Sequence, residues 1–130
     1  MGGFVVIDEY SELTHRIIGC AMTVHRKLGM GFPEVVYQRA LAIELFKQGL
    51  NAKREIDLPL FYENEKVGFR RADFFVERRV LVELKALGAL GAAHHAQLLN
   101  YLETFEVSVG LLLNFGTPSL EFKRLLKRLK

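Results

Sequence analysis

The stretch Arg70–Lys85 reads RRADFFVERRVLVELK, and the fold expected for this chain follows from it. Residues 66–76 and 79–86 are rich in β-branched, aromatic and alternating charged residues, which is typical of two strands. The charged residues Glu77–Arg79 between them are suited to the turn of a hairpin. The stretch therefore predicts two antiparallel neighbouring strands.

A three-residue turn places Asp73 directly opposite Glu83. Side chains alternate between the two faces of a sheet, so Arg71, Asp73 and Phe75 are expected to share one face. Glu83 and Lys85 share a face of the following strand, and cross-strand neighbours on one face lie ~5 Å apart. The pattern predicts two carboxylates side by side, with a lysine one step along.

Two adjacent carboxylates repel each other, so the pair favours a bound cation. Mg²⁺ prefers oxygen ligands and accepts one or two carboxylates while it keeps exchangeable waters. A lysine with an ordinary pKa of ~10.4 is protonated at neutral pH, so Lys85 is expected to orient a water and stabilise negative charge. Lys85 is a candidate base only if burial lowers its pKa. The same alternation also fits the solvated strand face of a purely structural protein.

The remaining chain divides into helical and strand segments. Apolar residues recur at helical spacing within residues 9–28, and again at Leu98, Leu102 and Phe105 within residues 92–105. We expect helices at 9–28, 33–48 and 92–105, strands at 52–62 and 107–114, and either a strand or a helix at 118–129. Pro33 is predicted at the first position of the second helix. The long 86–107 connection predicts a parallel crossover.

Composition predicts one soluble domain that spans residues 1–130. Half of the 130 residues are hydrophobic and a quarter are charged, as in ordinary globular proteins. Cys20 is the only cysteine, so no intrachain disulfide is possible, and the chain has neither a signal-peptide pattern nor an apolar run long enough for a membrane. A cytoplasmic location without membrane contact is the expectation.

The net charge of +3 is concentrated at the C-terminus. Residues 119–130 contain five Lys or Arg residues and one Glu. A basic tail fits contact with nucleic acid, and it equally fits a solvated chain end.

Several motifs together resemble a known family. The stretch Gly31-Phe-Pro-Glu34-Val-Val-Tyr37 matches the motif that names the GxxExxY protein family, and RADF, VELKA, HAQLLNYL and LLLNFG follow in order. That family is similar to the PD-(D/E)XK nucleases, although Ala72 stands where the proline of the name is expected. The resemblance implies a restriction-endonuclease-like α/β core, a mixed β-sheet flanked by helices in the order α-α-β-β-β-α-β.

The resemblance also implies roles for individual residues. The catalytic set would be Asp73, Glu83 and Lys85. The ligands of Mg²⁺ (or Mn²⁺) would be Asp73, Glu83, Glu34 and the Leu84 backbone carbonyl, with His25 as a further candidate. Gln97 and Tyr101 would contact the substrate. Arg71 is a further candidate for substrate contact because it is basic, not because of the resemblance.

Four of these residues have other readings. Gln97 and Tyr101 also suit an amphipathic helix with its polar edge at the surface. Glu34 also suits the first turn of a helix, where a carboxylate interacts favourably with the helix dipole. His25 also suits a hydrogen-bonded core position.

The expected function is a metal-dependent nuclease that hydrolyses the phosphodiester bonds of DNA. The alternative is a nucleic-acid-binding or assembly module that retains the nuclease fold and does not cut. A homodimer or a protein partner is compatible with either reading.

Overall fold

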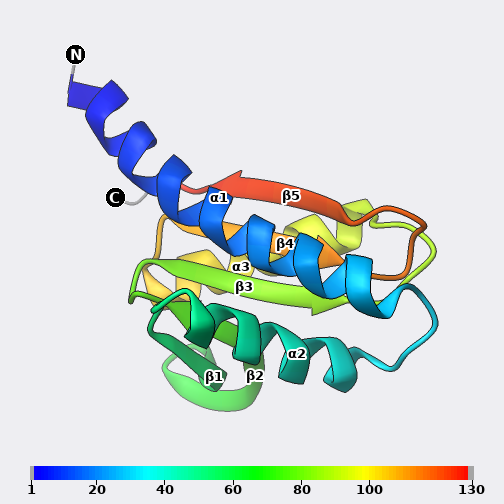
Figure 1. Ribbon diagram of the computed structural model, residues 1–130. Coiled ribbons are helices and arrows are strands. Elements are labelled where there is room, and N and C mark those ends of the chain that lie inside the picture. Colours follow the sequence, from blue (N-terminus) through cyan, green and yellow to red (C-terminus); the bar gives the residue numbers. More distant parts are fainter. Residues whose placement is uncertain (1, 129–130) are drawn as a thin grey trace.

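A five-stranded mixed β-sheet lies between helices on both of its faces (Figure 1). The computed structural model describes residues 2–128, and the side chains from Ser11 to Arg128. The elements in chain order are α1 (Gly2–Leu28), α2 (Glu34–Lys47), β1 (Ala52–Tyr62), β2 (Glu65–Val76), β3 (Val80–Lys85), α3 (Ala92–Phe105), β4 (Val109–Asn114) and β5 (Glu121–Leu126).

The strands lie in the sheet in the order in which they occur along the chain, β1-β2-β3-β4-β5. Every neighbouring pair is antiparallel except β3 and β4, which are parallel and are joined through α3. The predicted α/β class, the hairpin with Val76 paired to Val80, and the parallel crossover are all confirmed. Within the 118–129 segment, for which the sequence allowed a strand or a helix, Glu121–Leu126 forms the edge strand β5.

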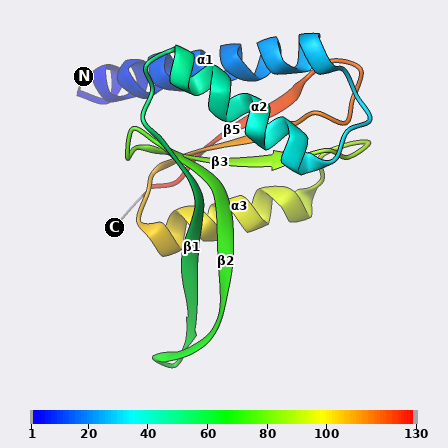
Figure 2. The same ribbon diagram turned by 60° about the horizontal axis from the view of Figure 1, so that its bottom comes forward.

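The sheet separates two hydrophobic cores. Helices α1 and α2 cover one face and α3 covers the other (Figure 2). Ile17, Leu41, Val82 and Leu111 belong to the first core, whereas Leu81, Leu98 and Leu112 belong to the second. Neighbouring residues of β3 and β4 thus enter opposite cores, as the alternation of a strand requires.

The predicted boundaries of α2 and α3 are close to the observed ones, whereas the predicted start of α1 is wrong. Helix α1 begins at Gly2 rather than at residue 9. It ends before Gly29, whose φ of 73° lies in the left-handed region that glycine adopts without steric cost. Pro33 is the N-cap of α2 rather than its first helical residue, because its ψ of 152° is extended. No helix in the described part of the chain has the length and apolarity to cross a membrane.

Strands β1 and β2 extend beyond the rest of the sheet as a two-stranded arm (Figure 2). The register shifts by one residue at Leu60/Phe61, and Glu63 and Asn64 make the turn with positive φ. Of the apolar residues Ile56, Leu58 and Leu60 on β1, only Leu58 is fully buried. The outer part of the arm has no helix to cover it, which accounts for the exposure there.

Candidate active site

Strands β2 and β3 separate at the point where the two acidic residues lie. Main-chain pairing runs from Val76↔Val80 to Phe74↔Val82, and the next positions are Asp73 and Glu83. The Asp73 backbone N–H donates to Glu83 Oε1 at 3.1 Å, and the Leu84 backbone N–H donates to Asp73 Oδ2 at 2.8 Å. The two carboxylates therefore take the place of main-chain acceptors, and each is held by the other strand.

The prediction that Phe75 shares a face of β2 with Asp73 is wrong. Phe75 stacks on Phe105 of α3 with ring centroids 5.8 Å apart, whereas Asp73 Oδ1 accepts a hydrogen bond from Gln38 of α2 at 2.7 Å. The alternation breaks beside Glu55, which lies on β1 between the partners of Phe74 and Ala72. Its φ of 54° is left-handed, and such a residue interrupts the regular pleat of a strand.

The pKa values of Asp73 and Glu83 are both raised above their ordinary values. Glu83 is only 5% exposed, and its burial, followed by the negative charge of Asp73, raises its pKa to about 8. Burial also raises the pKa of Asp73, although the hydrogen bonds from Leu84 and Gln38 and the charge of Lys85 act against that rise. Two buried carboxylates that resist ionisation together are a natural site for a cation.

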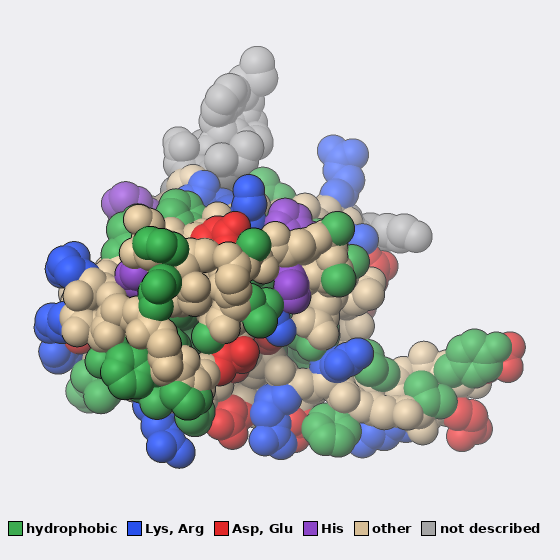
Figure 3. Space-filling view, turned by 90° about the vertical axis from the view of Figure 1, so that its right-hand side faces the viewer, with side chains coloured by type: hydrophobic (Ala, Val, Ile, Leu, Met, Phe, Trp, Pro, Cys, Tyr) green, Lys and Arg blue, Asp and Glu red, His purple; other side chains and the backbone are tan. Residues whose placement is uncertain are grey.

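Glu34 and Lys85 complete the acidic and basic groups at this end of the sheet. Burial raises the pKa of Glu34; the charge of Lys85 lowers it and that of Asp73 raises it, so the three groups are close enough to interact. Glu34, Val35, Gln38, Glu55 and Asp73 line an open pocket of about 240 Å³. Figure 3 shows acidic side chains gathered in a hollow of this face, with the arm projecting to one side.

The Gly31–Tyr37 motif builds the start of α2. Gly31 has a φ of 101°, which favours glycine strongly. The buried Tyr37 hydroxyl donates to the Gly29 carbonyl and accepts from the Phe32 N–H, and its ring stacks on Phe115 at 4.6 Å. The tyrosine thus anchors the loop that leads to Glu34, and it packs rather than reacts.

Helix α3 places one of its predicted substrate residues near the acidic pair. Tyr101 is buried, and its pKa is raised by that burial and by the charge of Glu83. Gln97 lies one turn earlier on the same helix and is half-buried. His94 Nδ1 accepts from the Gly91 N–H at 2.9 Å, which closes the N-terminus of α3.

His25 and Arg71 have partners elsewhere. His25 Nε2 lies 2.8 Å from the Thr117 carbonyl oxygen, and the imidazole stacks on Phe115. Arg71 is exposed on the arm, where its guanidinium lies 2.8 Å from Asp57 and 3.6 Å from Glu55. The structure therefore brings Asp73, Glu83, Lys85, Glu34 and Tyr101 together, and it gives His25 and Arg71 other contacts.

A divalent ion fits the carboxylate pair by its chemistry. Among the described residues, no three His, Cys, Asp or Glu side chains are grouped to hold a metal. Mg²⁺ needs only one or two carboxylates, because waters and substrate oxygens fill its other positions. The buried pair of Asp73 and Glu83 meets that requirement.

Sequence reasoning missed three residues of this region, namely Gln38, Arg54 and Glu55. Gln38 directly follows the tyrosine of the motif, which is the one signal that could have drawn attention to it. Arg54 and Glu55 lie in an ordinary-looking strand pattern, and the sequence carries no sign of the positive φ at Glu55.

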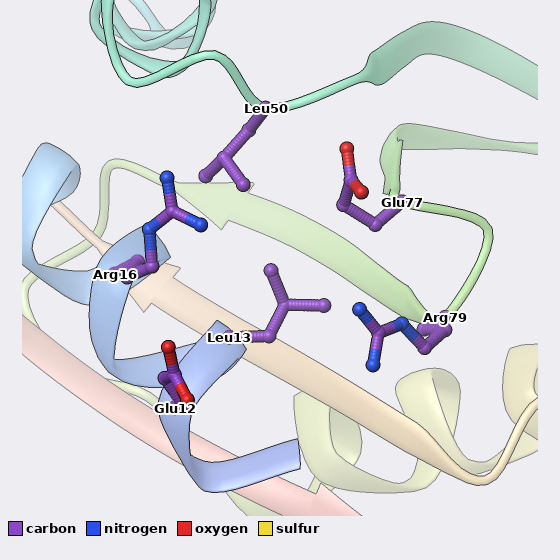
Figure 4. Close-up of a pocket in the computed structure, with 6 residues that line it drawn as sticks. All are labelled: Glu12, Leu13, Arg16, Leu50, Glu77 and Arg79. Atoms are coloured by element: carbon purple, nitrogen blue, oxygen red, sulfur yellow. The ribbon is translucent and has the colours of Figure 1, made fainter. Parts of the chain in front are cut away.

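A second pocket lies at the opposite end of β3, beside the β2–β3 turn (Figure 4). It measures about 190 Å³, and Leu13 and Leu50 form its apolar part. Two acidic and two basic side chains surround them: Glu12, Arg16, Glu77 and Arg79. None of the acidic pair or its neighbours contributes to this pocket.

Comparisons with known proteins agree with the fold. The family described as the PD-(D/E)XK nuclease superfamily matches residues 11–125. A solved structure, described as the crystal structure of SSO0001, is similar with a TM-score of 0.58 and 24% identity over 73% of this chain. The chain spans 50% of that solved chain, and at this identity the likeness shows the fold alone. No curated protein matched the chain.

Proposed function

The chain belongs to the PD-(D/E)XK nuclease superfamily. We therefore propose that it is a metal-dependent nuclease that hydrolyses the phosphodiester bonds of DNA, with Asp73, Glu83 and Lys85 as its active-site residues. The observation that carries the proposal is the pair of hydrogen bonds that joins Asp73 and Glu83 where β2 and β3 separate. Burial of both carboxylates, which raises both pKa values, supports a role in holding a cation.

The protein groups have separable roles in this proposal. A divalent ion bound by Asp73 and Glu83 would neutralise phosphate charge and acidify a water. Asp73 is held by the Leu84 N–H and by Gln38, so its carboxylate keeps one orientation before any ligand arrives. Such preorganisation avoids a reorganisation cost during the reaction.

Lys85 supplies a positive charge beside the scissile phosphate. It is half-buried at the end of β3, and its backbone carbonyl accepts from the Phe115 N–H at 2.8 Å, which fixes the end of the strand. An ammonium group placed there orients the attacking water and stabilises the negative charge that develops on the phosphate oxygens. Glu34 and the Leu84 carbonyl are the further ligands in this proposal.

The test is cleavage of labelled single-stranded, duplex and flapped DNA with Mn²⁺ by the wild type and by Asp73→Ala and Lys85→Ala. Each substitution should lower the cleavage rate at least ~100-fold, since each removes a group that stabilises the transition state. Mn²⁺ binding, measured by calorimetry, should be lost in Asp73→Ala and retained in Lys85→Ala.

Glu44→Ala and Lys47→Ala are the matched controls. These residues form an exposed ion pair of 3.3 Å near the other end of α2, so their removal should leave cleavage unchanged. Cleavage that persists in Asp73→Ala would contradict the proposed site. Tight DNA binding without cleavage or Mn²⁺ binding would contradict the nuclease and favour the non-cleaving module.

A further inference from the structure

Gln38 connects Asp73 to an arginine on another element. The Gln38 side chain is only 7% exposed on α2. Its Nε2 donates to Asp73 Oδ1 at 2.7 Å, and its Oε1 accepts from Arg54 Nη2 at 2.9 Å. A guanidinium, an amide and a carboxylate thus form a continuous chain from β1 through α2 to β2.

The chemistry of the three groups fixes the orientation of the amide. A guanidinium can only donate hydrogen bonds, and an ionised carboxylate can only accept them. The amide oxygen must therefore face Arg54, and the amide NH₂ must face Asp73. A reversed amide would leave two donors facing each other and two acceptors facing each other.

A neutral amide holds Asp73 without cancelling its charge. An arginine in direct contact would form a charge-assisted pair with the carboxylate and would compete with a cation for it. With Gln38 in between, the positive charge of Arg54 lies one group farther away. Gln38 therefore orients the Asp73 carboxylate without neutralising the charge that would attract a divalent ion.

The irregularity of β1 at Glu55 places the Arg54 side chain within reach of Gln38. Consecutive residues of a regular strand point to opposite faces. Here Arg54 bonds Gln38 and the next residue, Glu55, lines the same pocket as Gln38, so both reach the α2 side. The left-handed φ of 54° at Glu55 allows this, at an energetic cost for a residue other than glycine.

We propose that Gln38 and Arg54 are positioning residues that orient Asp73 for a divalent cation, with Arg54 acting only through Gln38. The inference rests on the proposed metal-dependent function and adds to it residues that have no catalytic part. Neither residue is expected to touch the substrate or the ion, since their described contacts in the site end at Asp73.

The first measurement is Mn²⁺ affinity, by calorimetry and by electron paramagnetic resonance, without DNA. Gln38→Met keeps the volume and removes both hydrogen bonds, and it should weaken Mn²⁺ binding ~10–100-fold, as loss of an outer-shell partner typically does. Arg54→Met should weaken binding by a smaller factor, and Arg54→Lys, which keeps a charged donor, should restore part of it. Gln48→Met and Arg39→Met, exposed positions of the same helix region, are the controls and should change nothing.

A double-mutant cycle separates positioning from mere packing. If Arg54 acts through Gln38, Arg54→Met should have no effect in the Gln38→Met background, because the path to Asp73 is already broken. Additive losses would overturn the proposal, and so would an unchanged affinity in folded Gln38→Met.

The side-chain amide resonances of Gln38 supply a readout that needs neither metal nor cleavage. They should move in Arg54→Met, whose substituted position is exposed and does not endanger folding, and they should move in Asp73→Asn. Resonances that respond to neither change would overturn the proposed hydrogen-bonded chain from Arg54 through Gln38 to Asp73, even if Gln38→Met fails to fold. A wild type that binds no Mn²⁺ while these shifts occur would contradict the proposed function and leave the hydrogen-bonded chain intact.

Discussion

At the scale of single residues, the surroundings of Glu83 raise the pKa of its carboxyl group. Its carboxylate is buried between β2 and α3, and it accepts a single described hydrogen bond, from the Asp73 N–H. Burial and the neighbouring Asp73 carboxylate both disfavour the ionised form. The protein therefore carries, in its metal-free state, a carboxyl group that prefers to keep its proton.

This preference predicts that the metal-free protein loses stability as pH rises. The pKa of Glu83 is about 8 in the folded state, above its ordinary 4.5, so the folded state binds the proton more tightly than the unfolded state. The contribution of protonated Glu83 to the free energy of unfolding is fully present below pH 4.5. It is lost as the pH rises to about 8 and above, by an amount on the order of a few kcal/mol. Urea unfolding in EDTA at pH 5 and pH 9 measures this loss.

Glu83→Gln is the matched variant for that experiment. It keeps the shape of the side chain and cannot ionise, so its unfolding free energy should fall less between the two pH values than that of the wild type. Added Mn²⁺ should restore stability to the wild type at pH 9 and not to the variant. Equal pH dependence in the two proteins would contradict the raised pKa.

At the scale of elements, the loop after β3 is held by the end of β4. The Asn114 side chain accepts hydrogen bonds from the N–H groups of Leu87 and Gly116 and donates to the Leu87 carbonyl and to Glu121. Asn114 is a buried residue that joins β4, β5 and the segment that follows Lys85.

The close approach at Gly116 makes a side chain intolerable there. A Cβ at Gly116 would lie 2.3 Å from the Leu87 carbonyl oxygen and 2.6 Å from the Ala86 carbonyl carbon. Gly116→Ala should therefore destabilise the protein by about 1–3 kcal/mol or more, since backbone must move. It should also slow any cleavage, because Ala86 directly follows Lys85.

Thermal unfolding checks this expectation, with Gly88→Ala as the control. A Cβ at Gly88 meets nothing within 4 Å, although the residue belongs to the same loop. A Gly116→Ala variant that unfolds at the wild-type temperature would show that the two segments are not in contact.

At the scale of the whole molecule, one sheet is shared by two cores. Leu111 of β4 is buried beneath α1 and α2, and its neighbour Leu112 is buried beneath α3. Since both cores need the same strands, neither layer is expected to unfold alone.

Leu111→Ala and Leu112→Ala should each cost about 2–5 kcal/mol through lost burial and the cavity left behind. Each variant should still unfold in one transition, seen alike by tyrosine fluorescence and by far-ultraviolet circular dichroism. Leu126→Ala, at a residue that is 60% exposed on β5, is the control and should change little. Two separate transitions in either core variant would contradict a shared sheet.

The local sequence pattern was enough to predict most of the helices and strands and the central hairpin of β2 and β3. The alternation in Arg70–Lys85 and its charged turn predicted that Asp73 and Glu83 would be adjacent, and the pairing of β2 with β3 and the hydrogen bond between these two residues agree with this. Short-range sterics and turn chemistry decide such features, so neighbouring residues carry the information. The superfamily motifs likewise predicted a mixed sheet flanked by helices, which the fold confirms.

Other features depended on contacts between distant segments. Residues 121–126 form a strand by pairing with the free edge of β4, and no local periodicity reveals that pairing. The break in alternation at Asp73, and the chain from Arg54 through Gln38, arise where β1, β2 and α2 meet. Hydrogen bonds between residues 16 and 35 positions apart form only after the layers have packed, so the tertiary structure alone decided which groups hold the acidic pair.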